Sequence, residues 1–512
     1  MRNLNATSTA CRRMNFSICF EKLLHANMGN YNGYMSFASI KLAVASSPKC
    51  ILSRTESLDF RIPALMFRNG ELTLLIDERP HPTEGFDWES LGGAMAADLP
   101  NPNRILMMTS PDYGETWGAA RPVPGTPRVC GDACIAWDDN GVTLAYAASE
   151  KIGYFGSRFE GERLEAWIAY GPDLYHLKHR RADSLYEELR CDGLFATSGS
   201  TPMWRGRALL PYVVKTGNDI EIRVVHVEKG VIVDVSESIV AKNNDGTTNA
   251  TDVFPAENVA VANDDEEKAG AEGNNAWFIS GGIKKTLDGS AMLDETTLEV
   301  VDDVIYANFR LQGRGGRLMA YSTDGVHFSV PKPWPGGVNS APDSERAQVA
   351  DSERALVPDS DRTQMPDSDR TQMPDPGCNA KLFALANKGA KVNDELVDGD
   401  VAGACCTEGA GGSEASYSHK DSADVSDDIT HDERVARGME TLCLVHPHDA
   451  NERKNGAIVD ISGRVILDIG PGEFGYADIV EMGNVAEEST AFALVFECEN
   501  SLYFTTFQSR GQ

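Results

Sequence analysis

The stretch SPDYGETW, residues 110–117, follows the pattern Ser-x-Asp-x-Gly-x-Thr-Trp without a mismatch. Such a pattern predicts a hairpin turn, because the Ser and Asp side chains can accept hydrogen bonds from backbone amides and the Gly tolerates a positive φ. We expect Trp117 to pack beneath this turn. A shortened copy, STDGVHF, occupies residues 322–328, and a degenerate one, GPDLYHL, occupies residues 171–177. The repeated turn indicates a repeated β unit.

The rest of the chain supports an all-β fold. Short strand-like runs separated by Gly, Asp, Asn and Pro recur, among them RILMMTS, VTLAYAA, ALLPYVV, EIRVVHV, VIYANFR, RLMAYST, AIVDIS, FALVFE and LYFTTF. Helical patterns of ten or more residues are scarce after residue 50. Many short strands with regular turns predict a sandwich, a barrel or a propeller. The turn pattern is that of the Asp box, which lies on blade hairpins of β-propellers, and it favours the propeller.

Composition excludes several classes of protein. The 512-residue chain carries a net charge of −30, which argues against nucleic acid and anionic membranes as partners. The sequence contains no run of about 18 apolar residues, so no membrane span is predicted. The eleven cysteines are an odd number, which favours free thiols in a reducing compartment. We therefore expect a cytoplasmic monomer, with secretion as the alternative. The CGDAC stretch (Cys130, Cys134) lacks partners at zinc-site spacing, so no metal is expected.

Three segments fall outside the strand pattern. Residues 1–48 have no continuous apolar run typical of a signal peptide, and we expect them to be an extension outside the core. The propeller domain is then predicted over residues 49–512. Residues 341–376 contain the octapeptide repeat DSER, DSER, DSDR, DSDR, and residues 387–437 are rich in Gly, Ala, Ser and Asp. Both lack the apolar residues of a core, so we expect disordered acidic loop inserts.

Arg61 is the first candidate functional residue. It lies in LDFRIPALMF, residues 58–67, whose alternation predicts a strand that the Asn69-Gly70 turn connects to the next. An Arg within an apolar strand has a large desolvation cost unless it meets an anion. That anion is either a structural carboxylate or a carboxylate that arrives with a ligand.

The stretch FRIPAL, together with the Asp box, resembles the bacterial exo-α-sialidases (neuraminidases) with Asp-box repeats. The resemblance extends from about residue 56 to the C-terminus and implies a six-bladed β-propeller with the site at its central axis. It also implies three arginines that bind the sialic acid carboxylate: Arg61, Arg310 in VIYANFR and Arg453 in NERKNGAIVDIS. A guanidinium suits this role because its planar fork binds a carboxylate bidentately and stays charged.

The resemblance implies three catalytic residues. Asp98, in DLPNPNRILMMTSPDYGETW, fits the acid that protonates the leaving oxygen, with Glu84 and Asp87 as rivals. Tyr476, in GPGEFGYADIVEM, fits the nucleophile, and Glu295 fits its base, with Asp294 and Glu299 as rivals nearby. A neutral Tyr can approach an anomeric carbon that carries a carboxylate, whereas a carboxylate nucleophile would be repelled, and a phenol needs a base to accept its proton.

Supporting residues follow from the same resemblance. Glu497, in LVFECE, matches a glutamate that holds the first arginine, and Asp77 and Arg79, in IDERP, match an orienting ion pair on the first blade. These assignments would give Arg61 a structural anion behind it and leave its other side open.

Together these observations predict a retaining exo-α-sialidase, a glycoside hydrolase that needs no cofactor. It would release terminal α-linked sialic acids from glycoproteins, from glycolipids such as gangliosides, and from oligosaccharides. The alternatives are a propeller that only captures sialylated glycans, a trans-sialidase, and a glycosidase for another sugar. A glycosidase for another sugar would not need three arginines that bind a carboxylate.

Overall fold

The computed structural model describes residues 41–82, 97–239, 293–311, 317–334, 378–385, 431–449, 452–486 and 489–510. The chain divides into two units, Met1–Ser39 and Ile40–Gln512, and all described residues belong to the second. The predicted insert at 341–376 lies outside the described residues, as do the insert at 387–437 up to residue 430 and the N-terminal extension up to residue 40.

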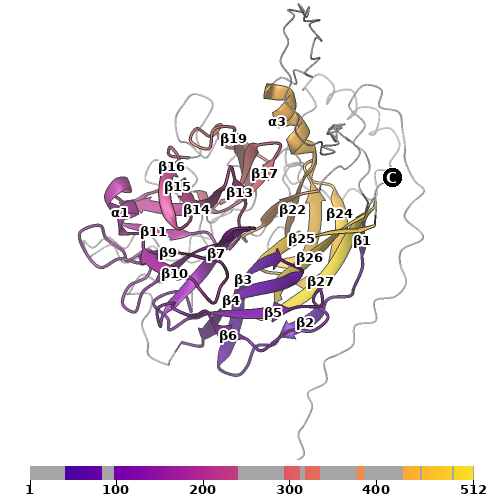
Figure 1. The fold of residues 1–512 in the computed structure, drawn as a ribbon, viewed down its shortest axis with the longest axis horizontal. Coiled ribbons are helices and arrows are strands. Elements are labelled where there is room, and N and C mark those ends of the chain that lie inside the picture. Colours follow the sequence, from indigo (N-terminus) through magenta and orange to yellow (C-terminus); the bar gives the residue numbers. More distant parts are fainter. Residues whose placement is uncertain are drawn as a thin grey trace, which may run out of the picture. The chain divides into compact units, whose positions relative to one another are not determined.

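The described residues form six β-sheets (Figure 1). The first sheet contains β3 (Leu58–Arg68), β4 (Glu71–Pro80), β5 (Arg104–Ser110) and β6 (Arg121–Pro122). The second contains β7 (Cys130–Asp138), β8 (Gly141–Ala148), β9 (Glu165–Gly171), β10 (Lys178–Arg181) and β12 (Gly199–Ser200). The third contains β11 (Gly193–Ala196), β13 (Met203–Trp204), β14 (Arg207–Thr216), β15 (Asp219–Glu228) and β16 (Val231–Val235).

The remaining sheets follow in chain order. The fourth contains β17 (Leu293–Val301), β18 (Val304–Leu311), β19 (Arg317–Ser322) and β20 (Lys332–Pro333). The fifth contains β21 (Lys381–Ala384), β22 (Leu442–Pro447), β23 (Lys454–Asp460) and β24 (Val465–Glu473). The sixth contains β25 (Ala477–Ala486), β26 (Ser489–Cys498), β27 (Ser501–Arg510), β1 (Lys41–Val44) and β2 (Lys49–Leu52).

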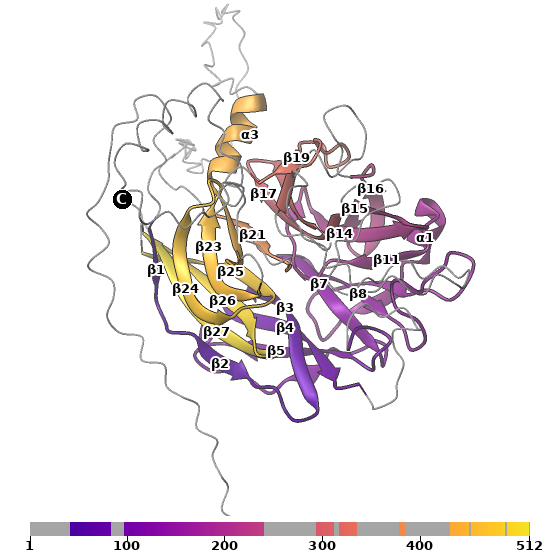
Figure 2. The same ribbon diagram turned by 180° about the vertical axis from the view of Figure 1, so that it is seen from behind.

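The six sheets close into a ring. Strands of each sheet contact strands of the next: β3 with β7, β7 with β11, β14 with β17, β17 with β21, β21 with β25, and β25 with β3. The sixth sheet combines both ends of the described chain, because β1 and β2 pair antiparallel with β27 (Figure 2). The fold is a six-bladed β-propeller, which confirms the prediction. Strand β1 lies before residue 49, where we predicted the propeller to begin.

The hydrophobic core lies between the blades. Six clusters of buried side chains each join two neighbouring sheets around the ring. Between the first and second blades, for example, Met66 of β3 and Leu75 of β4 pack with Ile135 and Leu144 of the second sheet. A fully buried Leu or Ile side chain contributes about 1.5–3 kcal/mol. The blades are therefore held together mainly by apolar contacts between sheets, and polar residues remain for the centre.

Within the described residues, two short helices accompany the sheets. Helix α1 is Asp183–Leu189, and α3 is His431–Glu440, which overlaps the end of the insert predicted at 387–437. The Tyr306 hydroxyl of β18 donates a hydrogen bond to the Val435 carbonyl in α3 at 2.8 Å. The strand pattern did not predict either helix. No helix of the described residues is long and apolar enough to cross a membrane.

The turn at residues 110–117 has the hydrogen bonds that its sequence suggests. The Gly114 amide donates to Ser110 Oγ at 2.8 Å, and the Thr116 amide donates to Asp112 Oδ1 at 2.9 Å. Gly114 has φ +89°, and a Cβ there would lie 2.1 Å from the Phe504 ring, so only glycine fits. Trp117 packs against that ring, with centroids 5.5 Å apart. The turn thereby anchors the first blade to the sixth.

Candidate active site

The structure places every site residue predicted from the sequence within the described part of the chain, on four blades and the segments that adjoin them. They are Arg61 in β3, Asp77 and Arg79 in β4, Asp98 before β5, Glu295 in β17, Arg310 in β18, Arg453 before β23, Tyr476 before β25 and Glu497 in β26. The rivals Glu84 and Asp87 lie outside the described residues.

Irregular pairing in three innermost strands aims side chains at the centre. The strand register shifts between Arg61 and Ala64 in β3, between Gly131 and Cys134 in β7, and between Leu293 and Thr296 in β17. Such bulges re-aim side chains and are frequent next to active sites. Here they carry Arg61, Asp132 and Glu295, respectively.

The first bulge is held by Glu497. Ile62 has φ 57°, an unfavourable conformation for a β-branched residue. Its amide donates to Glu497 Oε1 at 2.6 Å, and Arg61 Nη2 donates to Glu497 Oε2 at 3.2 Å. Burial opposes the charge of Arg61, but Glu497 outweighs it, so the pKa of Arg61 lies above its usual value. Arg61 is thus a fixed, permanently charged cation.

A glycine makes this arrangement possible. A Cβ at position 475 would lie 2.6 Å from Glu497 Oε2. The Gly475 amide donates to the Glu497 carbonyl, and the Glu497 amide donates to the Tyr476 carbonyl, both at 2.9 Å. The segment that carries Tyr476 is therefore tied to the strand that carries Glu497.

Tyr476, Glu295 and Arg310 form a continuous hydrogen-bonded chain. The Tyr476 hydroxyl donates to Glu295 Oε1 at 2.7 Å, and Arg310 Nη1 donates to Glu295 Oε2 at 2.6 Å. Tyr476 is 9% exposed. Burial and the negative charge of Glu295 raise the pKa of Tyr476 well above its usual value, while Arg310 and Arg453 act in the opposite direction. The phenol is neutral, and its proton already points at a carboxylate.

Two more guanidiniums flank the Tyr476 ring. The Cζ atoms of Arg61 and Arg453 each lie 5.5 Å from the ring centroid. Among the residues that the structure describes, none accepts a hydrogen bond from the Arg453 guanidinium. The pKa of Arg453 is raised by Cys378 against the effect of burial. The three predicted arginines thus lie around one tyrosine, and the N–H groups of the Arg453 guanidinium have no acceptor among the described residues.

A second charged group surrounds Arg79. Its Nη2 donates to Asp77 Oδ2 at 3.0 Å, and its Nη1 donates to Asp98 Oδ1 at 2.7 Å. Asp77 is fully buried, whereas the side chain of Asp98 is 34% exposed. Burial opposes the charge of Arg79, but the surrounding carboxylates outweigh it and raise its pKa. Asp98 therefore presents a carboxyl group to solvent from a fixed position.

The sequence reasoning missed Asp132. It has φ 60°, its amide donates to Asp77, and its Oδ1 lies 3.6 Å from Arg79 Nη2. Burial and the charge of Asp77 raise the pKa of Asp132 to about 8. An acidic residue inside the apolar stretch CGDACIAW is the same kind of signal as Arg61 in its strand, and it could have identified this residue.

Cys378 was also missed. It is fully buried and packs against Ile62 and Tyr476. Burial raises the pKa of its thiol to about 11, although Arg453 and Arg310 act in the opposite direction. No sequence signal marked it, because it follows the predicted insert. As for metals, the described residues contain no group of three or more His, Cys, Asp or Glu side chains arranged to hold an ion.

Comparison with known proteins shows that some solved structures have a fold similar to that of this chain. No protein-family model and no curated protein sequence matches the chain. A Trypanosoma rangeli sialidase mutant displaying trans-sialidase activity aligns with 91% of this chain and 59% of its own, at 11% identity and a TM-score of 0.49. The chain thus spans about three fifths of that protein.

Two other solved structures have similar coverage of this chain. The parainfluenza virus 5 hemagglutinin-neuraminidase, with the ligand DANA, aligns with 93% of this chain and 96% of its own, at 10% identity and a TM-score of 0.48. A protein of unknown function from Dyadobacter fermentans aligns with 92% of this chain and 100% of its own, at 11% identity and a TM-score of 0.45. Similarity at this level carries no information on activity.

Proposed function

We propose that this protein is a retaining exo-α-sialidase. The observation that carries the proposal is the hydrogen bond from the Tyr476 hydroxyl to Glu295, made in the midst of three arginines. A tyrosine paired with a carboxylate base is the nucleophile of sialidases, in place of the carboxylate that most glycosidases use.

The arginines provide the site for the substrate carboxylate. Glu497 holds Arg61, Glu295 holds Arg310, and Arg453 has no hydrogen-bond acceptor among the described residues. Arg310 Nε is also buried without a hydrogen-bond partner there. An incoming carboxylate would supply the missing acceptors through charge-assisted hydrogen bonds. A neutral sugar would leave these donors unsatisfied, which argues against a glycosidase for another sugar.

In the first step, Tyr476 Oη forms a bond to the anomeric carbon as the bond to the leaving oxygen breaks. The Tyr476 proton passes to Glu295, and Asp98 gives its proton to the leaving oxygen. In the second step, Asp98 accepts a proton from water, which attacks the same carbon. The bond to Tyr476 then breaks, and Glu295 returns the proton to Tyr476. Two displacements at one carbon retain its configuration.

The substrates would be sialylated glycans on proteins, lipids or oligosaccharides. The same site could transfer the sugar to an acceptor other than water, which is the trans-sialidase alternative. Asp98 carries the acid role here, because Arg79 fixes it while a third of its side chain stays exposed. Asp132 is the alternative acid, because it faces the same Arg79 and its raised pKa favours the protonated form.

The proposal is tested by hydrolysis of a fluorogenic α-sialoside. The native protein should release the fluorophore, and Tyr476→Phe should lose activity by about a thousandfold or more, within the range for removal of a proton-transferring or nucleophilic group. The control is Tyr212→Phe, because Tyr212 is also buried and its hydroxyl has no partner among the described residues. A protein that binds sialic acid without turnover would be a capture module, and one that does neither would refute the proposal.

The acid is identified by comparing leaving groups. An aryl sialoside needs little protonation of its leaving oxygen, whereas sialyllactose needs it fully. Asp98→Asn should therefore reduce the hydrolysis of sialyllactose by about a hundredfold more than that of the aryl sialoside. If Asp132→Asn has this selective effect and Asp98→Asn does not, the two roles must be exchanged.

A further inference from the structure

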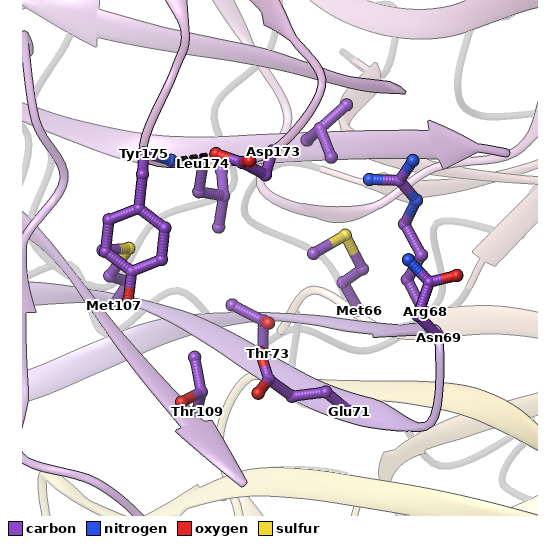
Figure 3. Close-up of a pocket in the computed structure, with 11 residues that line it drawn as sticks. Met66, Arg68, Asn69, Glu71, Thr73, Met107, Thr109, Asp173, Leu174 and Tyr175 are labelled. Carbon is purple, nitrogen blue, oxygen red and sulfur yellow. Dashed lines mark hydrogen bonds between the residues drawn. The ribbon is translucent and has the colours of Figure 1, made fainter. Parts of the chain in front are cut away.

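A pocket lies at the end of β3 that carries Arg68 (Figure 3). Arg68 follows Arg61 by seven positions in the same strand, which places the two residues about 20 Å apart. The pocket has a volume of about 260 Å³, slightly below the range of about 300–1,000 Å³ that is usual for small-molecule sites, which suits a single small sugar. It lies between the first sheet and the segment that connects β9 to β10.

The pocket combines an apolar floor with polar walls. Met66, Met107 and Leu174 are buried and form part of its lining. Thr73 and Thr109 lie opposite Leu174 (Figure 3), and no residue of the described chain forms a hydrogen bond with either hydroxyl. A pocket of this composition can bury the carbon skeleton of a ligand and bind its hydroxyl groups.

An aromatic side chain forms one wall. Tyr175 is 56% exposed and stands beside the pocket in Figure 3. Its position is fixed from the backbone, because the amides of Tyr175 and His176 both donate to Asp173 Oδ1, at 2.8 and 3.0 Å. An exposed ring on an ordered turn, next to hydrogen-bonding groups, provides a surface for the C–H face of a sugar.

The charges of the pocket favour a neutral ligand. The Glu71 carboxylate has no ion-pair or hydrogen-bond partner among the described residues. The Arg68 guanidinium donates to the carbonyls of Pro172 and Asp139, at 2.5 and 2.9 Å, so two of its nitrogens are engaged. Its Nε is buried and has no partner in the described chain. The lining carries two carboxylates, Glu71 and Asp173, against the one guanidinium of Arg68, so its net charge is negative and disfavours an acidic sugar.

We propose that this pocket binds a neutral pyranose, such as a hexose of a glycan chain. Glu71 would accept hydrogen bonds from neighbouring hydroxyls, Asn69 and the two threonines would bind further hydroxyls, and Tyr175 would cover the apolar face of the ring. The proposal does not depend on the activity proposed for the distant Tyr476 site. Its role would be to hold a glycan to the protein independently of the sugar that is cleaved.

The test is ligand-observed NMR with the methyl glycosides of galactose, glucose and mannose, followed by titration of the best ligand. The native protein should bind at least one of them saturably. Tyr175→Ala and Glu71→Gln should each weaken this binding at least tenfold. The matched control is Tyr113→Ala, because Tyr113 is 55% exposed and does not line the pocket, and this variant should bind like the native protein. All three variants should retain native sialoside hydrolysis.

Three outcomes would overturn the proposal. The first is that none of the three glycosides binds saturably. The second is binding that Tyr175→Ala and Glu71→Gln leave unchanged. The third is binding that Arg453→Gln abolishes, because the sugar would then occupy the other site. If the native protein does not hydrolyse sialosides, the activity proposed for Tyr476 is refuted, but the binding result at this pocket is unaffected.

Discussion

Two groups of charged side chains at the centre of the propeller differ in how many of their polar atoms have hydrogen-bond or ion-pair partners. Asp478 is fully buried and accepts hydrogen bonds from the amides of Leu65, Ser200 and Ile479 and from the Ser200 hydroxyl, at 2.7 to 3.0 Å. Lys381 Nζ lies 3.6 Å from its Oδ1 and donates to the Ser200 carbonyl. We call these residues the Asp478 cluster.

The arginines around Tyr476 have fewer partners: Arg61 and Arg310 each bind one glutamate with part of the guanidinium. Glu497 and Glu295 hold Arg61 and Arg310, and the side chains of these two arginines remain 15% and 17% exposed. Arg453 has no hydrogen-bond acceptor in the described chain. The difference indicates that the Asp478 cluster stabilises the fold, whereas the arginine group has unused binding capacity. Buried charge alone is therefore no sign of function, and the unused donors are the informative feature.

The largest expected effect on stability is at the Asp478 cluster. Lys381→Met should lower the free energy of unfolding by about 3–5 kcal/mol, because it leaves a buried carboxylate without its cation. Urea unfolding measures the change. Arg128→Met is the control, because its ion pair with Glu150 is exposed and should contribute less than about 1 kcal/mol. If Lys381→Met lowers the free energy of unfolding no more than Arg128→Met does, the Asp478 cluster does not stabilise the fold as described.

The opposite pattern is expected at Arg453. Arg453→Gln should raise the KM for sialosides about 10- to 100-fold, because a hydrogen bond to a charged group contributes about 1.5–3 kcal/mol. Its free energy of unfolding should change by less than about 0.5 kcal/mol, because the guanidinium makes no hydrogen bond in the described chain. Steady-state kinetics and urea unfolding test both parts. A destabilised variant with native KM would make Arg453 a structural residue.

A smaller effect is expected from the titration of Asp132. Burial and Asp77 raise its pKa from 3.8 to about 8. Between these values the folded protein keeps a proton that the unfolded chain has released. The free energy of unfolding should therefore fall as pH rises from about 4 to 8, and the contribution of Asp132 should level off above pH 8.

Asp132→Asn should remove this contribution and flatten the pH dependence. The measurement is urea unfolding of both proteins at several pH values across this window. If the native protein and Asp132→Asn have parallel stability profiles, Asp132 does not carry the retained proton.

Much of the architecture could be predicted from the sequence, and the reason is periodicity. Strand alternation and the turn at residues 110–117 indicated a β-propeller, and the structure confirms it. The predicted Arg61, Glu497, Tyr476, Glu295 and Arg310 lie in one connected group, although their roles stay proposals. Their order along the chain was the signal that the sequence reasoning used.

What could not be predicted depends on register and on contacts between distant strands. The bulges that aim Arg61, Asp132 and Glu295 inward break the alternation from which strands are recognised. The Asp478 cluster joins β3, β12, β21 and β25, and no local pattern links residues so far apart. Strand β1 falls within the predicted N-terminal extension, and its pairing with β27, at the other end of the chain, has no local sequence signal.

The most direct test of the central claim is to trap the covalent intermediate. In 2,3-difluorosialic acid, the fluorine at C3 slows both chemical steps and the fluoride at C2 is a good leaving group, so a sugar–enzyme bond should accumulate. Mass spectrometry of digested protein then locates the added mass. The account predicts an adduct on Tyr476 in the native protein and none in Tyr476→Phe. An adduct on a carboxylate such as Glu295 or Asp98, or no adduct in a protein that hydrolyses sialosides, would contradict it.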